Sequence, residues 1–250
     1  MLAIISDIHA NAEALEAVLQ SAWMQGIEEI WCLGDLVGYG PNPQKCIDLI
    51  QKNCKVCLMG NHDWAVLHSP VSFNSIATRM IYKTKKWLKP GEDADEQQIE
   101  RWEFLENLPK YHDEDDSCFV HASPREKLTE YLLPSDVQYD REKLQNVLET
   151  IDHYCFVGHT HVPCCIKEGL ELVVPEGNGF TVELDERNAI INVGSVGQPR
   201  DGDNRASYVI LDENRVTWYR VPYRFEKTAA EIAKLGKDYG ILGHRLRVGR

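Results

Sequence analysis

The chain has 250 residues, of which 43% are hydrophobic and 26% charged, and a formal net charge of −12. This composition is that of an ordinary globular protein and excludes a disordered, collagen-like or low-complexity chain. The length permits one large domain or two small ones, and the acidic balance argues against broad, non-specific nucleic-acid binding.

Three short apolar runs early in the chain predict buried strands, at residues 2–6, 30–33 and 56–59. After the first run, Asn11 is placed to cap a helix whose apolar residues recur with helical spacing from Leu15 to Ala22. A second helix is expected around residues 46–50. Alternating strands and helices predict a parallel sheet with right-handed crossovers.

The middle of the chain changes character between about residues 64 and 116. Strand patterns give way to helical spacing in two segments, which an acidic stretch at residues 90–96 separates. Because so short a segment makes a thin core on its own, we expect a helical cap or insertion within a single domain spanning residues 1–250.

Strands resume beyond the helical segment, at residues 117–120 and 154–157. Further short runs, joined by Gly, Asn and Asp turns, predict an antiparallel half at residues 172–174, 180–184, 190–193, 207–211 and 216–221. Residues 226–237 predict a closing helix.

The sequence predicts a cytoplasmic protein without membrane contact. The N-terminal apolar run ends at Asp7 with no basic segment before it, and no window reaches the roughly 18 apolar residues of a membrane span. The eight cysteines are therefore expected to be reduced thiols. Cys54 and Cys57 have the spacing of a zinc or redox pair, but on a strand they would point to opposite faces.

Polar side chains follow the predicted strands at the points where the strands end, where ligands gather in open α/β sheets. They are Asp7, His9, Asp35, Asn61, His62, His121, His159 and His161. The ends of Asp7-x-His9 and of His159-x-His161 would share a face if the backbone were extended. Each piece alone is common by chance, but together, after five successive strands, they favour a metal or catalytic site over a structural role, because unpaired polar groups are costly to bury.

The motifs around these residues resemble those of the calcineurin-like metallophosphoesterase superfamily. They are Asp7-x-His9-x-Asn11, Gly34-Asp35-x-x-Gly38, Gly60-Asn61-His62-Asp63, Val120-His121-x-Ser123 and Gly158-His159-Thr160-His161. The segment from Asn192 to Arg200 resembles the small bacterial and archaeal phosphodiesterase-like branch, whereas Ala122 replaces a glycine found in many members. The resemblance implies a four-layer α/β/β/α sandwich with a small helical insertion.

The same resemblance implies two divalent transition-metal ions side by side. Asp7, His9 and His161 would hold the first ion, Asn61, His121 and His159 the second, and Asp35 would bridge them. Imidazole and carboxylate ligands suit Mn, Fe, Zn or Ni better than Mg or Ca, and we expect Mn. Two such ions clamp a phosphoryl group and generate the hydroxide that attacks phosphorus.

Other residues are expected to serve the reaction around the metals. The resemblance implies that His62 protonates the leaving group and that Asp63 orients its imidazole; the alternative is that His62 only donates a hydrogen bond to phosphate. Candidate substrate contacts are Asn61, Asn11, Arg125 and Arg200, although helix capping explains Asn11 and an ordinary surface position explains either arginine. Tyr39 and Trp64 could form a stacking wall or simply pack.

The leading hypothesis is a metal-dependent phosphoesterase that acts on small phosphodiester or nucleotide-like substrates. The alternative within the enzyme class is a phosphomonoesterase, including one like serine/threonine phosphoprotein phosphatases. A nuclease ranks below both because the acidic chain would repel a long polyanion. A non-catalytic metal-binding scaffold is disfavoured, since all seven expected ligands and His62 are present.

Overall fold

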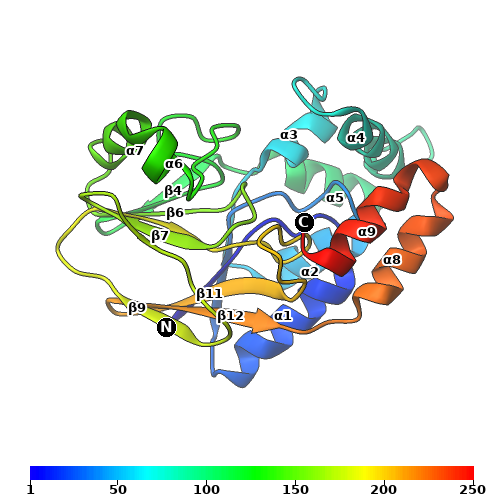
Figure 1. Cartoon of the computed structure of the whole chain (residues 1–250). Helices are drawn as coiled ribbons and strands as arrows, with labels where there is room; N and C mark the ends of the chain where they lie inside the picture. Colours follow the sequence, from blue (N-terminus) through cyan, green and yellow to red (C-terminus); the bar gives the residue numbers. More distant parts are fainter.

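Two six-stranded sheets stack face to face at the centre of the molecule (Figure 1). The computed structural model describes residues 1–250. Helices cover the outer face of each sheet, which makes four layers in the order α/β/β/α and confirms the expected fold class. No helix is long and apolar enough to cross a bilayer.

The first sheet begins with the predicted N-terminal unit. Its strand order is β3 (Val56–Cys57), β2 (Glu29–Cys32), β1 (Leu2–Ile5), β11 (Ala206–Asp212), β12 (Arg215–Val221) and β9 (Phe180–Glu183). The first three strands are parallel, and helices α1 (Ala12–Met24) and α2 (Pro43–Asn53) connect them, as expected. The side chain of Asn11 accepts a hydrogen bond from the Ala14 amide and so caps α1.

The second sheet contains strands from the middle and the end of the chain. Its order is β4 (Tyr111–Glu114), β5 (Ser117–Val120), β6 (Tyr154–Val157), β10 (Ala189–Asn192), β7 (Cys164–Lys167) and β8 (Glu171–Val173). The C-terminal strands pair with one another in antiparallel fashion, as expected. They do not form one half of the fold, however, because β7, β8 and β10 join this sheet while β9, β11 and β12 join the first. Alternating side chains show which residues face inward but not which strand becomes the neighbour.

Several elements escaped the sequence patterns. They are β4, β7, and helices α6 (Asp136–Tyr139), α7 (Arg141–Leu148) and α9 (Gly240–Val248). Strand β7 is buried at every residue and thus lacks the alternation of a half-exposed strand. Strand β4 is mostly exposed at the edge of its sheet, where polar residues carry no strand signal.

The core between the sheets is aromatic and aliphatic. Trp31, Phe119, Phe156 and Trp218 are buried there together with Ile4. The indole nitrogen of Trp218 donates to the Asn192 carbonyl, 2.9 Å away, which satisfies its only polar atom. This packing holds the two sheets in a fixed relation, so the loops at their ends keep their positions.

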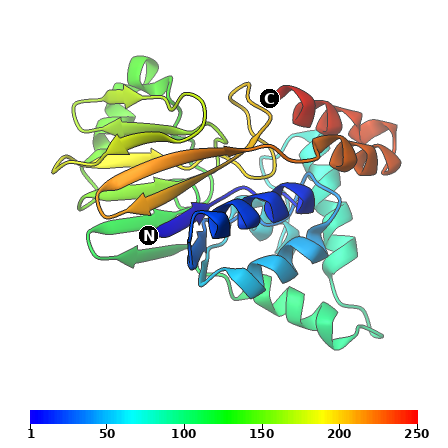
Figure 2. The ribbon, with the colours of Figure 1, turned by 90° about the horizontal axis from the view of Figure 1, so that it is seen from below.

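The expected helical segment contains α3 (Asn61–Leu67), α4 (Ser75–Leu88) and α5 (Glu96–Glu106). Ile81 and Leu105 pack in the same core as α1 and α2. The C-terminal helices α8 (Phe225–Lys234) and α9 flank this segment, with a short 3-10 turn η1 (Lys237–Tyr239) between them. Figure 2 shows these helices together at one end of the molecule, beside the sheets.

Candidate metal centre

The seven expected metal ligands converge where the two sheets meet, although they follow strands of both sheets and not of one. Asp7 and His9 follow β1, Asp35 follows β2, Asn61 begins α3 after β3, His121 follows β5, and His159 and His161 follow β6. All except the half-buried Asn61 are buried. We call these seven residues the ligand cluster.

The backbone of the ligand cluster is not extended. The ends of Asp7-x-His9 and of His159-x-His161 therefore do not share a face in the way that an extended backbone would allow. Five members have a left-handed backbone with φ between 48° and 62°: Asp7, His9, Asp35, His159 and His161. Such conformations cost non-glycine residues about 1 kcal/mol or more each and persist where the surroundings enforce them. As a result His159 and His161 diverge, and their rings lie beside His121 and His9, respectively.

One group of ligands surrounds His9 and His161. Their Nε2 atoms lie 3.0 Å apart, and Asp7 Oδ1 lies 3.2 Å from that of His161. Each Nδ1 faces a backbone carbonyl, of Val37 and Gln198, so each must donate there and leave a lone pair on Nε2. Asp7 Oδ1 is buried without a hydrogen-bond partner. Two facing lone pairs and an unpartnered carboxylate oxygen fit a bound cation.

A second group surrounds His121. Its Nδ1 donates to the Leu33 carbonyl at 3.1 Å, and its Nε2 lies 3.1 Å from Asn61 Oδ1. The Nε2 of His159 donates to the Thr129 carbonyl at 3.3 Å, which leaves Nδ1 of that ring to accept. Imidazole and amide oxygen donors without thiolate match transition-metal ions of intermediate softness.

Asp35 lies between the two groups. Its Oδ2 is 3.6 Å from His9 Nε2 and 3.5 Å from His121 Nε2, so one oxygen atom reaches both. Its Oδ1 accepts the His62 backbone N–H at 2.7 Å. Burial acts against its ionisation, but His121, His62 and His9 together outweigh burial and hold the pKa of Asp35 well below its usual range.

The charges of the ligand cluster call for a cation. Burial would lower the pKa of His121, yet Asp35 raises it to about 9. Burial likewise opposes ionisation of Asp7, but His161 lowers the pKa of that carboxyl below its usual range. The two buried carboxylates thus stay ionised and draw a proton onto His121, where a metal ion would supply the positive charge instead.

His62 lies next to the ligand cluster in an aromatic enclosure. Its ring centroid is 4.5 Å from that of Tyr39, 4.9 Å from Phe73 and 4.7 Å from His9. Its Nδ1 is buried without a hydrogen-bond partner. Burial lowers the pKa of His62 to about 4, so the imidazole of the free protein is neutral at pH 7. An anionic phosphate beside the ring would raise that pKa.

The expectation that Asp63 orients the His62 ring is wrong. Its carboxylate accepts three backbone N–H groups, from Gly60 at 3.0 Å, Leu36 at 3.3 Å and Val37 at 3.2 Å. Asp63 therefore ties the start of α3 to the loop after β2. Because it is the third residue of that helix, its side chain points back toward the unsatisfied amides of the first turn and not along the His62 ring.

A cavity of about 160 Å³ opens beside the ligand cluster, and Asn61, His62 and Arg200 line it. The Arg200 guanidinium lies 5.6 Å from the centre of the Tyr39 ring, and its Nη2 donates to Gln198 Oε1 at 3.0 Å. The Nε of Arg200 is buried without a partner. This cation is thus oriented by its neighbours at the wall of the cavity.

Two expected substrate contacts lie elsewhere. Arg125 pairs with the Glu130 carboxylate and does not line the cavity. Asn11 donates to the Gly197 carbonyl at 2.9 Å and to the Tyr223 hydroxyl at 3.2 Å, besides capping α1, so its polar atoms are already engaged. Local partners thus engage the side chains of both residues.

Sequence analysis missed part of the cavity wall. Thr129 and Tyr131 line it on the segment before α6, and residues 71–74 line it before α4. These residues lie in irregular segments without a motif, so no pattern marks them. Of the two aromatics considered for a stacking wall, Tyr39 is buried against His62, and Trp64 lies outside the cavity under the Lys110 ammonium, 4.3 Å from its ring centre.

Comparisons with known proteins identify the family of the chain. A family model described as the calcineurin-like phosphoesterase superfamily domain matches residues 1–215. The chain is 41% identical to an uncharacterized protein, MJ0912, of Methanocaldococcus jannaschii over all of this chain and 98% of that protein. It is 26% identical to a symmetrical bis(5'-nucleosyl)-tetraphosphatase of Pseudomonas fluorescens, over 47% of this chain and 40% of that enzyme.

A solved structure has the same fold. The metallophosphoesterase from Sphaerobacter thermophilus superposes with a TM-score of 0.84 at 38% identity, covering 100% of this chain and 99% of that one. The likeness therefore extends over both sheets and the helical segment. The chain belongs to the calcineurin-like phosphoesterase superfamily and is a hydrolase of phosphoester bonds.

Proposed function

We propose that the protein is a dinuclear metallophosphoesterase that hydrolyses small phosphodiester or nucleotide-like substrates. The observation that carries the dinuclear centre is the position of Asp35 Oδ2, within 3.6 Å of a ligand from each group. One shared carboxylate oxygen is the feature that a bridged pair of ions requires, because it offsets the repulsion between two cations. The tetraphosphatase named above is a distant relative that acts on a nucleotide, which supports the substrate class.

The proposed ligand sets are those expected from the motifs. Asp7, His9 and His161 would hold the first ion, and Asn61, His121 and His159 the second. When bound, such a pair neutralises phosphoryl oxygens and lowers the pKa of water. Manganese is the proposed metal because mixed nitrogen and oxygen donors accept it. The cytoplasmic location stays a prediction.

The side chains around the metals would bind and orient the ester. Arg200 lines the cavity and would donate an ionic hydrogen bond, one of the stronger kind, to a phosphoryl oxygen. His62 lies against the ligand cluster without a partner for Nδ1, and an anionic substrate would raise its pKa toward protonation. In that state the ring would donate a proton to the departing oxygen.

The cavity has the size of the phosphoryl end of a substrate. About 160 Å³ is below the roughly 300 Å³ at which drug-sized ligand sites begin. A phosphoryl group with its nearest substituents fills such a space, and the rest of the ester must lie at the rim. Phosphomonoester hydrolysis, including that of phosphoproteins, is the alternative that the first experiment separates.

The test is hydrolysis of bis-p-nitrophenyl phosphate beside p-nitrophenyl phosphate. The protein is stripped with a chelator and reloaded with Mn²⁺, Ni²⁺, Zn²⁺ or Mg²⁺, and the His62→Ala variant is measured in parallel. Metal-restored, His62-dependent release from the diester is the expected result. Preference for the monoester would favour the phosphatase alternative, and silence on both with metal bound would contradict the proposed activity.

A further inference from the structure

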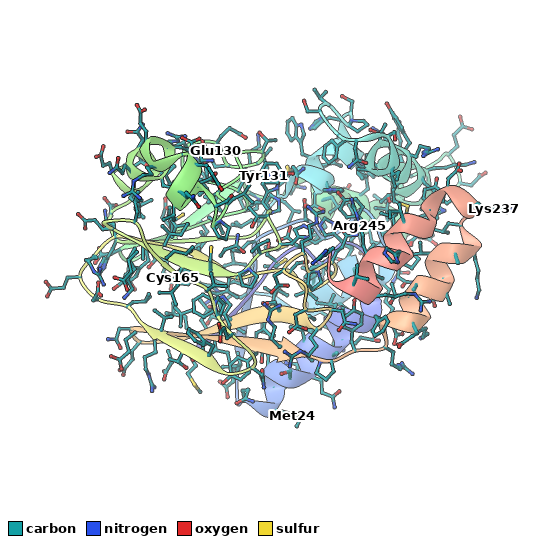
Figure 3. The ribbon with its side chains drawn as sticks, in the orientation of Figure 1. Met24, Glu130, Tyr131, Cys165, Lys237 and Arg245 are labelled. Carbon is teal, nitrogen blue, oxygen red and sulfur yellow. The ribbon has the colours of Figure 1, made fainter.

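A tyrosine ring that no motif marks lies at the mouth of the cavity. Tyr131 lines the cavity, and its ring centroid is 4.2 Å from that of His159 with a tilt of 38°. The side chain is nevertheless 48% exposed. In Figure 3, Tyr131 lies between helices α6 and α3, which stand on either side of it. One part of the Tyr131 ring therefore packs on the His159 ring, and the other part is open to solvent.

Hydrogen bonds anchor the two residues that precede Tyr131. The carboxylate of Glu130, the preceding residue, accepts hydrogen bonds from the Ser123 hydroxyl and from Arg125 Nε. The Thr129 carbonyl accepts the Nε2–H of His159 at 3.3 Å. Arg125 thus contributes to the site indirectly, by holding this segment. A ring presented on an anchored segment loses little conformational entropy when a ligand covers it.

The chemistry of the cavity changes from its floor to its rim. The floor is polar and carries Asp35, His161 and Arg200. At the rim stand Tyr131 and, on the segment before α4, Val71 and Phe73. Val71 is 75% exposed, and the polar Ser72 and Asn74 line the same segment, so the rim offers exposed apolar surface among polar groups. A ligand with an ionic end and a flat apolar end matches this change of polarity.

The exposed part of the Tyr131 ring offers a flat aromatic surface at the mouth of the cavity. A neutral phenol stacks on a flat aromatic group without charge repulsion from the phosphoryl end of a ligand. An aliphatic substituent would gain much less from the same face. The rim therefore discriminates between substrates by the shape and polarisability of the substituent that projects out of the cavity.

We propose that Tyr131 is a specificity-determining residue, on whose exposed face a planar aromatic substituent of a phosphodiester, such as a nucleobase, stacks. The phosphoryl group of the same ester occupies the polar floor beside Arg200 and the ligand cluster. This inference rests on the proposed phosphodiesterase function and adds the chemical class of the group that the rim selects.

The experiment compares two diesters that share one leaving group. They are the p-nitrophenyl ester of thymidine 5'-monophosphate and methyl p-nitrophenyl phosphate, both assayed with the Mn²⁺-loaded protein. Tyr131→Ala should lower kcat/KM for the nucleoside ester about tenfold, mainly through KM, because base–aromatic stacking has that magnitude. The methyl ester should change less than about twofold, and Tyr131→Phe should retain the preference for the nucleoside ester.

Tyr139→Ala is the matched control, because Tyr139 is 78% exposed on α6 and lies outside the cavity. It should leave both substrates unchanged. An equal loss on both esters in Tyr131→Ala, or no loss on either, would overturn the proposal. An equal loss with a reduced metal content would show that Tyr131 only positions His159.

A second measurement separates this inference from the proposed function. If the wild-type protein hydrolyses neither diester, the proposed phosphodiesterase activity fails. Binding of thymidine 5'-monophosphate and of inorganic phosphate to the Mn²⁺-loaded protein then tests Tyr131 alone. Weaker nucleotide binding by Tyr131→Ala with unchanged phosphate binding would support the stacking site, and equal binding of nucleotide to both proteins would refute it.

Discussion

Gly38 leaves the space that the imidazole of His62 occupies: a β-carbon at position 38 would lie closer than 3.0 Å to His62 Nδ1. Gly38 also has a φ of 100°, which side chains rarely adopt. Because Nδ1 of His62 has no hydrogen-bond partner, packing alone holds the ring. The position of His62 over the site therefore depends on the absence of a side chain at Gly38.

Gly38→Ala is expected to displace the His62 ring and to lower kcat about 100-fold, the cost of a misplacement near 1 Å. Metal content should stay that of the wild type, because Gly38 is not a ligand. Kinetics and elemental analysis check both points. Gly169→Ala is the control, since Gly169 has a φ of 81° and nothing within 4 Å of a β-carbon. It should cost stability without lowering kcat, and an unchanged kcat in Gly38→Ala would contradict the role of packing.

Asp35→Asn is expected to lose most of the bound metal from both positions. The amide keeps one oxygen but removes the charge that lies between His9 and His121. Metal content per chain, measured by elemental analysis after dialysis, should fall below about one ion, and activity should vanish. Asp136→Asn removes another buried carboxylate away from the site and serves as control. A full metal complement in Asp35→Asn would refute the bridging role.

Asp63→Ala is expected to lower the free energy of unfolding, although Asp63 lies beside the candidate metal centre. Three backbone N–H groups lose their acceptor, and the loop after β2 loses its tie to α3. Leaving buried donors unsatisfied should lower the free energy of unfolding by about 3 kcal/mol. Urea denaturation measures this, and Asp63→Asn, which keeps one acceptor oxygen, should lose less. Wild-type stability in Asp63→Ala would show that water replaces the carboxylate.

Arg200→Ala should lower kcat/KM for methyl p-nitrophenyl phosphate about tenfold to 100-fold, because an ionic hydrogen bond to the phosphoryl group disappears. Arg125→Ala should change kcat/KM for methyl p-nitrophenyl phosphate less than about twofold, since Glu130 and not substrate is its partner. Steady-state kinetics of the two variants side by side decide the point. The reverse order of effects would return Arg125 to the substrate site.

Glu13 connects the first turn of α1 to α8 and gives a pH-dependent stability. Burial would raise the pKa of Glu13, but Lys227 and Arg224 outweigh it and lower that pKa. A depressed pKa stabilises the fold above the unfolded value near 4.3 and loses that contribution as the pH falls through the folded value. Glu13→Gln should therefore cost about 1 kcal/mol at pH 7, as Arg224 is largely exposed. The difference from wild type in urea denaturation should shrink below about pH 4, and a constant difference would exclude ionisation as its source.

The sequence by itself determined the local part of this protein. Strands β1 to β3 and helices α1 and α2 follow from apolar periodicity and a capping Asn11, because each depends on residues a few positions apart. The ligand cluster was recognisable for the same reason, since its residue types follow strand ends within short motifs. The family match confirms the class of enzyme that those motifs indicated.

Only the tertiary structure decided what lies next to what. The C-terminal strands divide between two sheets. The Asp63 carboxylate accepts backbone N–H groups and does not bond to the His62 ring, and the Tyr131 ring lies beside that of His159. None of these relations has a sequence signal, because hydrogen bonds and packing join segments that are far apart in the chain. A side chain's chemistry is encoded locally, whereas its partner is set by the distances that the folded chain brings about.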